Sequence, residues 1–198
     1  EPDGTGLVSF VTSVVAYFCM FSQLGIPTYG IRACAKVRDD REELSRTVQE
    51  LFLINLFMCV LVYVSFFISL FAVPRFTQNK ILFLIISSSI LFNAIGMEWL
   101  YKALEQYSYI TIRSIIFKVI AVIAMFLLVR QKSDTVIYGA ISIFAASASN
   151  IFNFIHAHHY ISFKSVGNYN FRRHMKAILI FFAMSCATTI YTNLDTVM

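Results

Sequence analysis

Long apolar stretches separated by short polar segments dominate the pattern of this chain. About 20 apolar residues allow a helix to cross the hydrocarbon core of a bilayer. Because a helix pairs its own backbone amides, such stretches predict transmembrane helices. We place six of them, at residues 7–23, 51–73, 81–100, 110–129, 135–155 and from about 177 onward. The sequence therefore predicts an all-α fold, a polytopic membrane helix bundle.

Local signals set the ends of two of these spans. Gly25-Ile26-Pro27 is expected to bend or end the first span, and Pro74 to close the second. Residues 39–46 are rich in helix formers and place acidic side chains where a helix N-terminus favours negative charge. This segment predicts a polar, cytoplasmic start for the second helix.

The loops differ in their content of Lys and Arg, which sets orientation in the membrane. The loops after the first, third and fifth spans hold ten such residues: Arg32, Lys36, Arg38, Arg41, Arg46, Lys102, Lys164, Arg172, Arg173 and Lys176. The loops on the other side hold four: Arg75, Lys80, Arg130 and Lys132. The first group is therefore predicted to face the cytoplasm, with the N-terminal end of the chain outside.

Composition supports the membrane assignment and argues against other classes. Hydrophobic residues make up 58% of the chain and charged residues 14%, against about 25% charged in soluble domains. The formal net charge is +5, but the cations form short clusters between apolar runs, so we expect no nucleic-acid partner. The four scattered cysteines are predicted to be apolar packing residues.

No catalytic motif is visible, so we predict a protein that is not an enzyme and needs no cofactor. His156, His158 and His159 form a tract where the fifth span meets the cytoplasm. No Cys or carboxylate nearby completes a metal site, so this tract is interpreted as an interfacial cluster and no metal is expected.

Ionisable side chains within the spans are the candidates for function. They cost about 2.5–3.5 kcal/mol to insert and usually face a polar interior or a partner. Lys118 lies near the middle of the fourth span, and Thr111 and Ser114 share its helical face. We interpret this face as one wall of a hydrated, cationic cavity. The alternative is that Lys118 pairs with an acid from a segment outside this chain.

Arg113 lies nearer the cytoplasmic end of the same span, roughly 140° around the helix from Lys118. Glu98, at the end of the preceding span, is a candidate partner. The sequence leaves open whether Arg113 forms a structural pair with Glu98 or binds substrate.

The fifth and sixth spans each carry a polar or small-residue stripe. The stripe of the fifth comprises Gly139, Ser142, Ala146, Ser149 and Asn153. It predicts either close helix packing or the lining of a water-filled cavity. The stripe of the sixth comprises Ser185, Thr188, Thr192 and Asp195. Asp195 is a candidate for proton or sodium binding, with a structural partner or an outer-surface residue as the alternatives; Glu98 is a second candidate for ion coupling.

Several stretches resemble bacterial O-antigen and polysaccharide flippases of the Wzx type, within the superfamily that includes the MATE exporters. They are residues 6–10, the motif Gln23-Leu24-Gly25-Ile26-Pro27-Thr28-Tyr29-Gly30-Ile31-Arg32, residues 98–101, residues 104–107 and Asn193-Leu194-Asp195. The resemblance implies about twelve spans in two six-helix bundles. The chain has no initiator methionine and stops inside an apolar run, so we expect a fragment. Residues 1–176 would belong to the N-terminal bundle and 177–198 would begin the C-terminal one.

The resemblance also implies a function. The expected substrate is an undecaprenyl-pyrophosphate-linked oligosaccharide, moved across the bacterial inner membrane by alternating access and coupled to a proton or sodium gradient. Lys118, Arg113, Ser114 and Thr111 would then bind substrate, and membrane lipids and the O-antigen polymerisation machinery are candidate partners. A cation-coupled drug or metabolite antiporter on the same fold is the alternative. A membrane-embedded polymerase or glycosyltransferase is disfavoured, since no loop exceeds about twenty residues.

Overall fold

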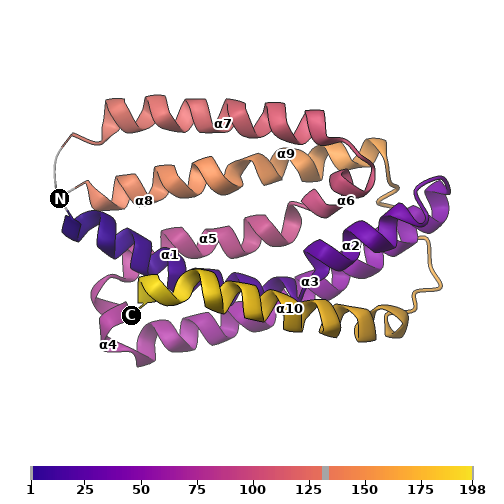
Figure 1. Ribbon diagram of the computed structural model, residues 1–198, viewed down its shortest axis with the longest axis horizontal. Coiled ribbons are helices and arrows are strands. Elements are labelled where there is room, and N and C mark those ends of the chain that lie inside the picture. Colours follow the sequence, from indigo (N-terminus) through magenta and orange to yellow (C-terminus); the bar gives the residue numbers. More distant parts are fainter. Residues whose placement is uncertain (1, 131–133, 198) are drawn as a thin grey trace.

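The protein is a bundle of helices that run along its long axis, as seen in a computed structural model (Figure 1). The structure describes the backbone of residues 2–130 and 134–197 and the side chains of residues 6–130, 134 and 136–188. Its elements are α1 (Pro2–Gln23), α2 (Ile26–Ala35), α3 (Arg41–Ala72), α4 (Pro74–Gln78), α5 (Lys80–Ile95), α6 (Glu98–Ala103), α7 (Tyr107–Leu128), α8 (Thr135–Ile143), the π-helix η1 (Phe144–Ala148), α9 (Ser149–His156), the 3₁₀-helix η2 (Ala157–His159) and α10 (Arg172–Val197).

Five helical segments are long and apolar enough to cross a membrane. They cover Gly6–Ala35, Arg41–Ala72, Lys80–Ala103, Tyr107–Leu128 and Val136–His159. This confirms the predicted polytopic all-α fold. The sixth predicted span lies within α10, whose side chains from residue 189 onward are outside the described residues. The division into two bundles at residue 177 stays a prediction.

The second span begins and ends as its sequence signals indicate. The Asp40 carboxylate accepts hydrogen bonds from the backbone N–H groups of Glu42 and Glu43, at 2.9 and 3.1 Å, and so caps α3. At the other end Pro74 opens the short α4, where its fixed φ is compatible with a first helical turn.

Apolar side chains cover both the inside and the outside of the bundle. One core cluster joins α1, α3 and α5 around Val11, Phe66 and Phe83; a second lies near the other end, around Leu51 and Leu100. Large apolar side chains also cover the outer faces of α3 and α7. A surface of this kind is suited to lipid.

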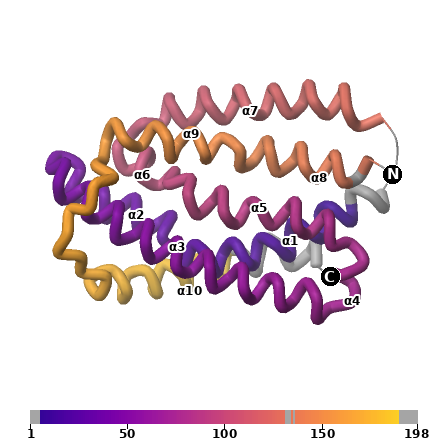
Figure 2. The backbone as a smooth tube through the Cα atoms, turned by 180° about the vertical axis from the view of Figure 1, so that it is seen from behind, coloured from indigo at the N-terminus to yellow at the C-terminus, as the bar shows by residue number. Residues whose placement is uncertain are grey.

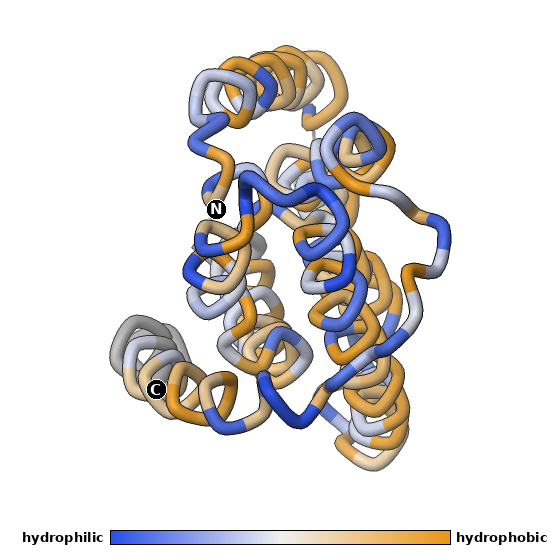
Figure 3. Tube along the Cα trace, turned by 90° about the vertical axis from the view of Figure 1, so that its right-hand side faces the viewer, coloured by the Kyte–Doolittle hydropathy of each residue, from blue (hydrophilic) through white to orange (hydrophobic). Residues whose placement is uncertain are grey.

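The basic loops gather at one end of the bundle. α2, the start of α3, α6 and the connection into α10 lie at the right-hand end of Figure 1; α4, the end of α7 and the start of α8 lie at the left. Figure 2 shows the same division from behind, and Figure 3 shows hydrophilic segments along the loops of the basic end. The arrangement agrees with the two groups of loops on which the orientation was predicted.

Three of the spans are interrupted. α1 and α2 are separated at Leu24-Gly25, where Gly25 has a φ of 73°; α5 and α6 are separated at Gly96-Met97, where Met97 has a φ of 41°. Between α8 and α9 the chain forms η1, a single π-helical turn. The predicted bend at Gly25-Pro27 is therefore confirmed.

Gly25 also lies directly against the backbone of α10. A Cβ at this position would come within 2.5 Å of the Phe182 nitrogen and 2.6 Å of the Phe181 carbonyl carbon. Glycine is therefore required twice here, for the positive φ and for the close approach of α10.

Gly25→Ala should destabilise the protein. The left-handed backbone costs roughly 1–2 kcal/mol in a residue with a Cβ, and the overlap with α10 adds about 1–3 kcal/mol. Gly167→Ala is the matched control, because Gly167 has a φ of 75° and a Cβ added there would meet no atom within 4 Å. Unfolding in detergent should show the larger loss for Gly25→Ala, and equal losses would contradict the assigned contact with α10.

Candidate functional site: a polar cavity between interrupted helices

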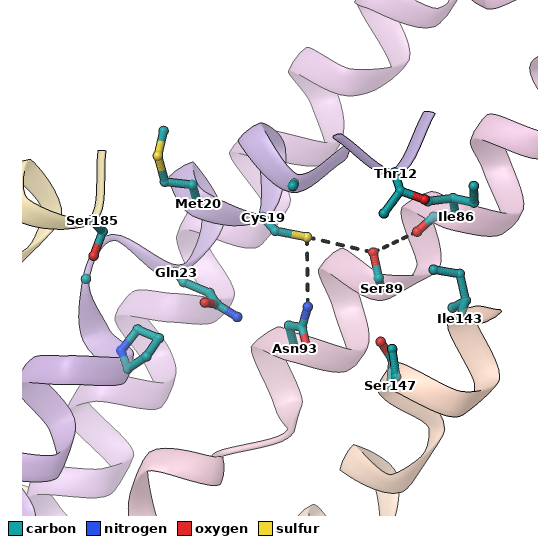
Figure 4. Close-up of a pocket in the computed structure, with 14 residues that line it drawn as sticks. Thr12, Cys19, Met20, Gln23, Ile86, Ser89, Asn93, Ile143, Ser147 and Ser185 are labelled. Carbon is teal, nitrogen blue, oxygen red and sulfur yellow. Dashed lines mark hydrogen bonds between the residues drawn. The ribbon is translucent and has the colours of Figure 1, made fainter. Parts of the chain in front are cut away.

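A cavity of about 460 Å³ lies inside the bundle between α1, α5, η1 and α10. Apolar side chains such as Ile86 and Ile143 form part of its wall. Its polar lining, as far as side chains are described, is uncharged and comprises Thr12, Gln23, Ser89, Asn93, Ser147 and Ser185. Figure 4 shows these side chains around one common space.

A second space of about 170 Å³ continues this cavity towards the basic end. The two share Gln23, Pro27 and Asn93, so they adjoin. The second space adds Asn55 and Asn150 and ends at Glu98 and Lys102, whose charged groups lie 2.8 Å apart. Together the two spaces form a polar path, here called the amide path, from the bundle interior to the basic end.

The amide path follows the helix interruptions, which leave backbone groups without helical partners. Asn55 of α3 donates a hydrogen bond of 3.0 Å to the Ala94 carbonyl, just before the break between α5 and α6. Asn150 packs over Gly96 at the same break, where a Cβ would lie 2.6 Å from its Cγ. Two amides of the path therefore contact the backbone at the break between α5 and α6.

Some of the amides remain free to bind a ligand. Asn150 donates to the Asn93 carbonyl oxygen at 3.2 Å, and Asn93 makes a long contact of 3.9 Å with the Cys19 sulfur. Gln23 is half-buried, and no hydrogen bond to its side chain is found among the described residues. Its amide offers a donor and an acceptor to whatever fills the cavity.

The π-turn decides which residues of the fifth span face the cavity. Before it, Gly139 packs tightly, since a Cβ there would lie 2.7 Å from a Leu82 methyl group on α5. The additional residue in the turn shifts the helical face, so that Ser147 and Asn150 reach the amide path together with Ala146. Of the predicted stripe, Gly139 therefore packs closely and Ala146 borders the cavity. The polar groups that line the amide path here, Ser147 and Asn150, lie outside the stripe.

The predicted substrate residues on α7 do not line the amide path. Lys118 and Thr111 are exposed, and Ser114 is half-buried. The expectation that these residues bind substrate stays a prediction.

Arg113 differs from its neighbours because it is only 8% exposed. Within the described part of the chain, its Nε and Nη1 atoms have no hydrogen-bond partner. The guanidinium lies 5.7 Å from the Tyr109 ring centroid. It borders an apolar groove of about 510 Å³ formed with Phe152 of α9. No ion pair joins Arg113 to Glu98 among the described residues; Glu98 pairs with Lys102.

Of the two ion-coupling candidates, the structure describes the side chain of Glu98. Glu98 is at the end of the amide path, as described above. Asp195 and Thr192 fall outside the residues whose side chains the structure describes.

A charged cluster that the sequence analysis missed lies at the basic end. Glu50 of α3 is 0% exposed, and its Oε2 lies 2.8 Å from an Arg173 nitrogen and 2.6 Å from His174 Nε2. Arg173 also contacts Glu43 at 2.7 Å. These contacts fasten the first turn of α10 to α3.

The connection before α10 is held by the same part of α3. Gln49 donates hydrogen bonds to the carbonyls of Ser162 and Lys164 at 2.6 and 2.9 Å, and accepts one from the Tyr169 hydroxyl at 2.7 Å. The backbone N–H of Asn170 donates to Glu50 Oε1 at 2.6 Å. The polar start of α3 is therefore an anchor for the chain between the fifth and sixth spans.

The sequence carried signals for these residues. Gln23, Asn55 and Asn93 are isolated amides within otherwise apolar runs, and Glu50 adjoins the start of the second run. The cost of burying charge singles out ionisable groups near span centres, and it does not single out uncharged amides or an acid at a span boundary.

Interrupted transmembrane helices around a polar cavity are characteristic of membrane transport proteins. Comparison with known sequences makes this assignment specific. The chain belongs to the polysaccharide biosynthesis protein family, whose model matches residues 1–198. This confirms the resemblance seen in the sequence, and the protein is a multi-pass membrane protein.

One similar protein is the "Putative O-antigen transporter" of Escherichia coli (strain K12). It is 21% identical over 150 residues, which cover 76% of this chain and 35% of that protein. The chain thus spans about a third of the length of this relative. No solved structure matches this chain significantly.

Glu50→Gln should weaken the attachment of α10. The change removes a buried carboxylate that accepts charged hydrogen bonds, each worth about 1.5–3 kcal/mol. Unfolding in detergent should show a loss of this order. Glu42→Gln is the control, because Glu42 is 74% exposed in its pair with Arg46 and should change stability by less than about 0.5 kcal/mol. Similar losses in the two variants would show that the buried cluster contributes no special stability.

Proposed function

We propose that this chain is part of a flippase for undecaprenyl-pyrophosphate-linked O-antigen or polysaccharide repeat units in the bacterial inner membrane. The family and the similarity to an O-antigen transporter support polysaccharide export. The observation that carries the proposal is the amide path, which is polar but lined mainly by uncharged groups.

Uncharged amides and hydroxyls suit an oligosaccharide. Each sugar hydroxyl both donates and accepts hydrogen bonds, and an Asn or Gln side chain offers both functions. Within an apolar bundle such a lining replaces the hydration of the sugar, while leaving each individual contact weak enough to exchange. A drug cation would instead favour carboxylates, and among the residues whose side chains the structure describes the lining contains one, Glu98, which is paired with Lys102.

The pyrophosphate requires cations, which lie elsewhere on the molecule. In this proposal Lys118 and Arg113 supply fixed positive charge on α7, with Ser114 and Thr111 as hydroxyl donors on the same helix. The lipid tail remains among membrane lipids, next to the apolar outer surface, while the headgroup moves. Alternating access would use the interruptions at Gly25 and Gly96 as points where half-helices change direction.

Gln23→Leu tests the sugar-binding role of the amide path. The substitution keeps a similar volume and breaks no hydrogen bond among the described residues, so folding should be preserved. Loss of one or two hydrogen bonds to substrate, at about 0.5–1.5 kcal/mol each, should reduce export roughly 2- to 150-fold. Surface polysaccharide is measured at equal protein levels in the membrane. Gln78→Leu, on the exposed α4, is the control, and normal export by Gln23→Leu would count against this role.

Lys118→Ala tests the proposed role of Lys118 as a fixed positive charge for the pyrophosphate. We expect normal membrane insertion and loss of surface polysaccharide, because a fixed counter-charge for the pyrophosphate is removed. Lys118→Arg retains the charge and should preserve a measurable part of the export. Full polysaccharide display by Lys118→Ala would remove Lys118 from the mechanism.

A further inference from the structure

A hydrogen-bonded chain of three titratable side chains joins α2, α3 and α10 at the basic end. The Tyr29 oxygen lies 2.8 Å from His174 Nδ1, and His174 Nε2 lies 2.6 Å from Glu50 Oε2. His174 is 3% exposed and Glu50 0% exposed. Tyr29 borders an open space of about 630 Å³, so the chain leads from that space to a buried carboxylate.

The neutral imidazole satisfies every atom of this chain. With the proton on Nε2, the ring donates to Glu50 and the Tyr29 hydroxyl donates to Nδ1; this tautomer is assigned from the contacts. A second proton, on Nδ1, would compete with the Tyr29 proton, so the phenol must turn its hydrogen away. Nδ1 is therefore the atom at which a proton can be added from the side of the open space.

The charges around the ring come from all three helices. α3 contributes Glu50 and, through Arg173, Glu43. α10 contributes Arg173, whose Nε lies 3.2 Å from His174 Nε2. α2 contributes Tyr29 and places Arg32 and Lys36 on the same open space.

These groups act on the ring in opposite directions. Burial lowers the pKa of His174 below its usual value, while Glu50 favours the protonated ring and Arg173 opposes it. With α10 docked, the outcome is a lowered pKa. Moving α10 away would expose the ring to water and return its pKa towards the ordinary value near 6.5.

We propose that His174 is a proton-binding site whose occupancy controls the docking of α10 onto α2 and α3. A proton is taken up at Nδ1 when α10 separates, and it is released when α10 docks and Tyr29 donates to the same nitrogen. The proposal stands on this geometry; if the proposed function is also correct, it assigns a place where proton binding acts on the first helix of the second bundle.

The sign of the pH effect follows from linkage. A histidine whose pKa is lower when docked than when free stabilises the docked form above about pH 6.5. That stabilisation is lost progressively as the pH falls, because the free form binds the additional proton. Acidification should therefore separate α10 from α2.

A distance measurement tests this in the full-length protein in lipid nanodiscs. Spin labels replace Ala33 on α2 and Ala177 on α10, which border the same open space, in a background without native cysteines. Between pH 7.5 and 5.5 we expect a reversible increase in the population with long distances. His174→Gln should abolish this response, whereas His159→Gln, which changes an exposed histidine, should retain it. A distribution independent of pH, or a response that survives in His174→Gln, would overturn the proposal.

A second measurement does not depend on a His174 variant. Exchange of the imidazole C2 hydrogen for deuterium, followed by mass spectrometry, reports the titration midpoint of each histidine. The midpoint of His174 should lie below 6.5 and rise in Gly25→Ala, where the new methyl group forces α10 outward. An unchanged midpoint would refute the link between protonation and docking. Neither measurement requires substrate, so failure here leaves the proposed export function standing, and loss of export in Gln23→Leu leaves the proton site standing.

Discussion

The structure depends on one constraint: a backbone or side-chain polar group that faces lipid must find its partner within the protein. Uninterrupted helices meet this constraint alone, and α3 and α7 can therefore present large apolar side chains to the outside. An interrupted helix cannot pair all of its own backbone groups, so its break needs partners from other helices. The breaks at Gly25, Gly96 and η1 face the interior, and Asn55 supplies the missing donor for the carbonyl of Ala94. The polar cavity follows from this requirement, since amides that satisfy a broken helix also create a surface for a polar ligand.

The same constraint explains how α10 is attached. A lone Glu50 at 0% exposure would be prohibitively costly, so it is surrounded by Arg173, His174 and the backbone N–H of Asn170. The partners come from the chain just before and within the first turn of α10, which makes the docking of this helix inseparable from the pairing of the acid. At the middle of the bundle Gly25 supplies the second contact, of backbone against backbone. The first attachment depends on charge, and the second depends only on shape.

Sequence patterns predicted most of the helices, and the reasons are physical. The signals for the helices are local: apolar length, Pro74, the acidic segment at the start of α3 and the bend at Gly25. Each determines the structure of the residues next to it. The cavity could not be located in this way. Gln23, Asn93 and Asn150 come from three spans, and their meeting depends on helix packing and on the register shift produced by the π-turn. The position of a residue along its span was also an incomplete guide to its burial, because Lys118, near the middle of the span, is exposed while Arg113, nearer the end, is buried.

The buried Arg113 and the amide path are two polar surfaces of different chemistry. The Arg113 guanidinium keeps its charge at any accessible pH, yet two of its nitrogens lack hydrogen-bond partners among the described residues. Aromatic contact with Tyr109 offsets only a small part of that cost, about 0.5–2 kcal/mol. An anion at this position would satisfy it, and the apolar groove beside it fits a hydrocarbon chain better than a sugar. The amide path has the complementary chemistry, with uncharged groups suited to hydroxyls. The proposed substrate, which carries a phosphate next to a lipid chain as well as an oligosaccharide, would satisfy both surfaces.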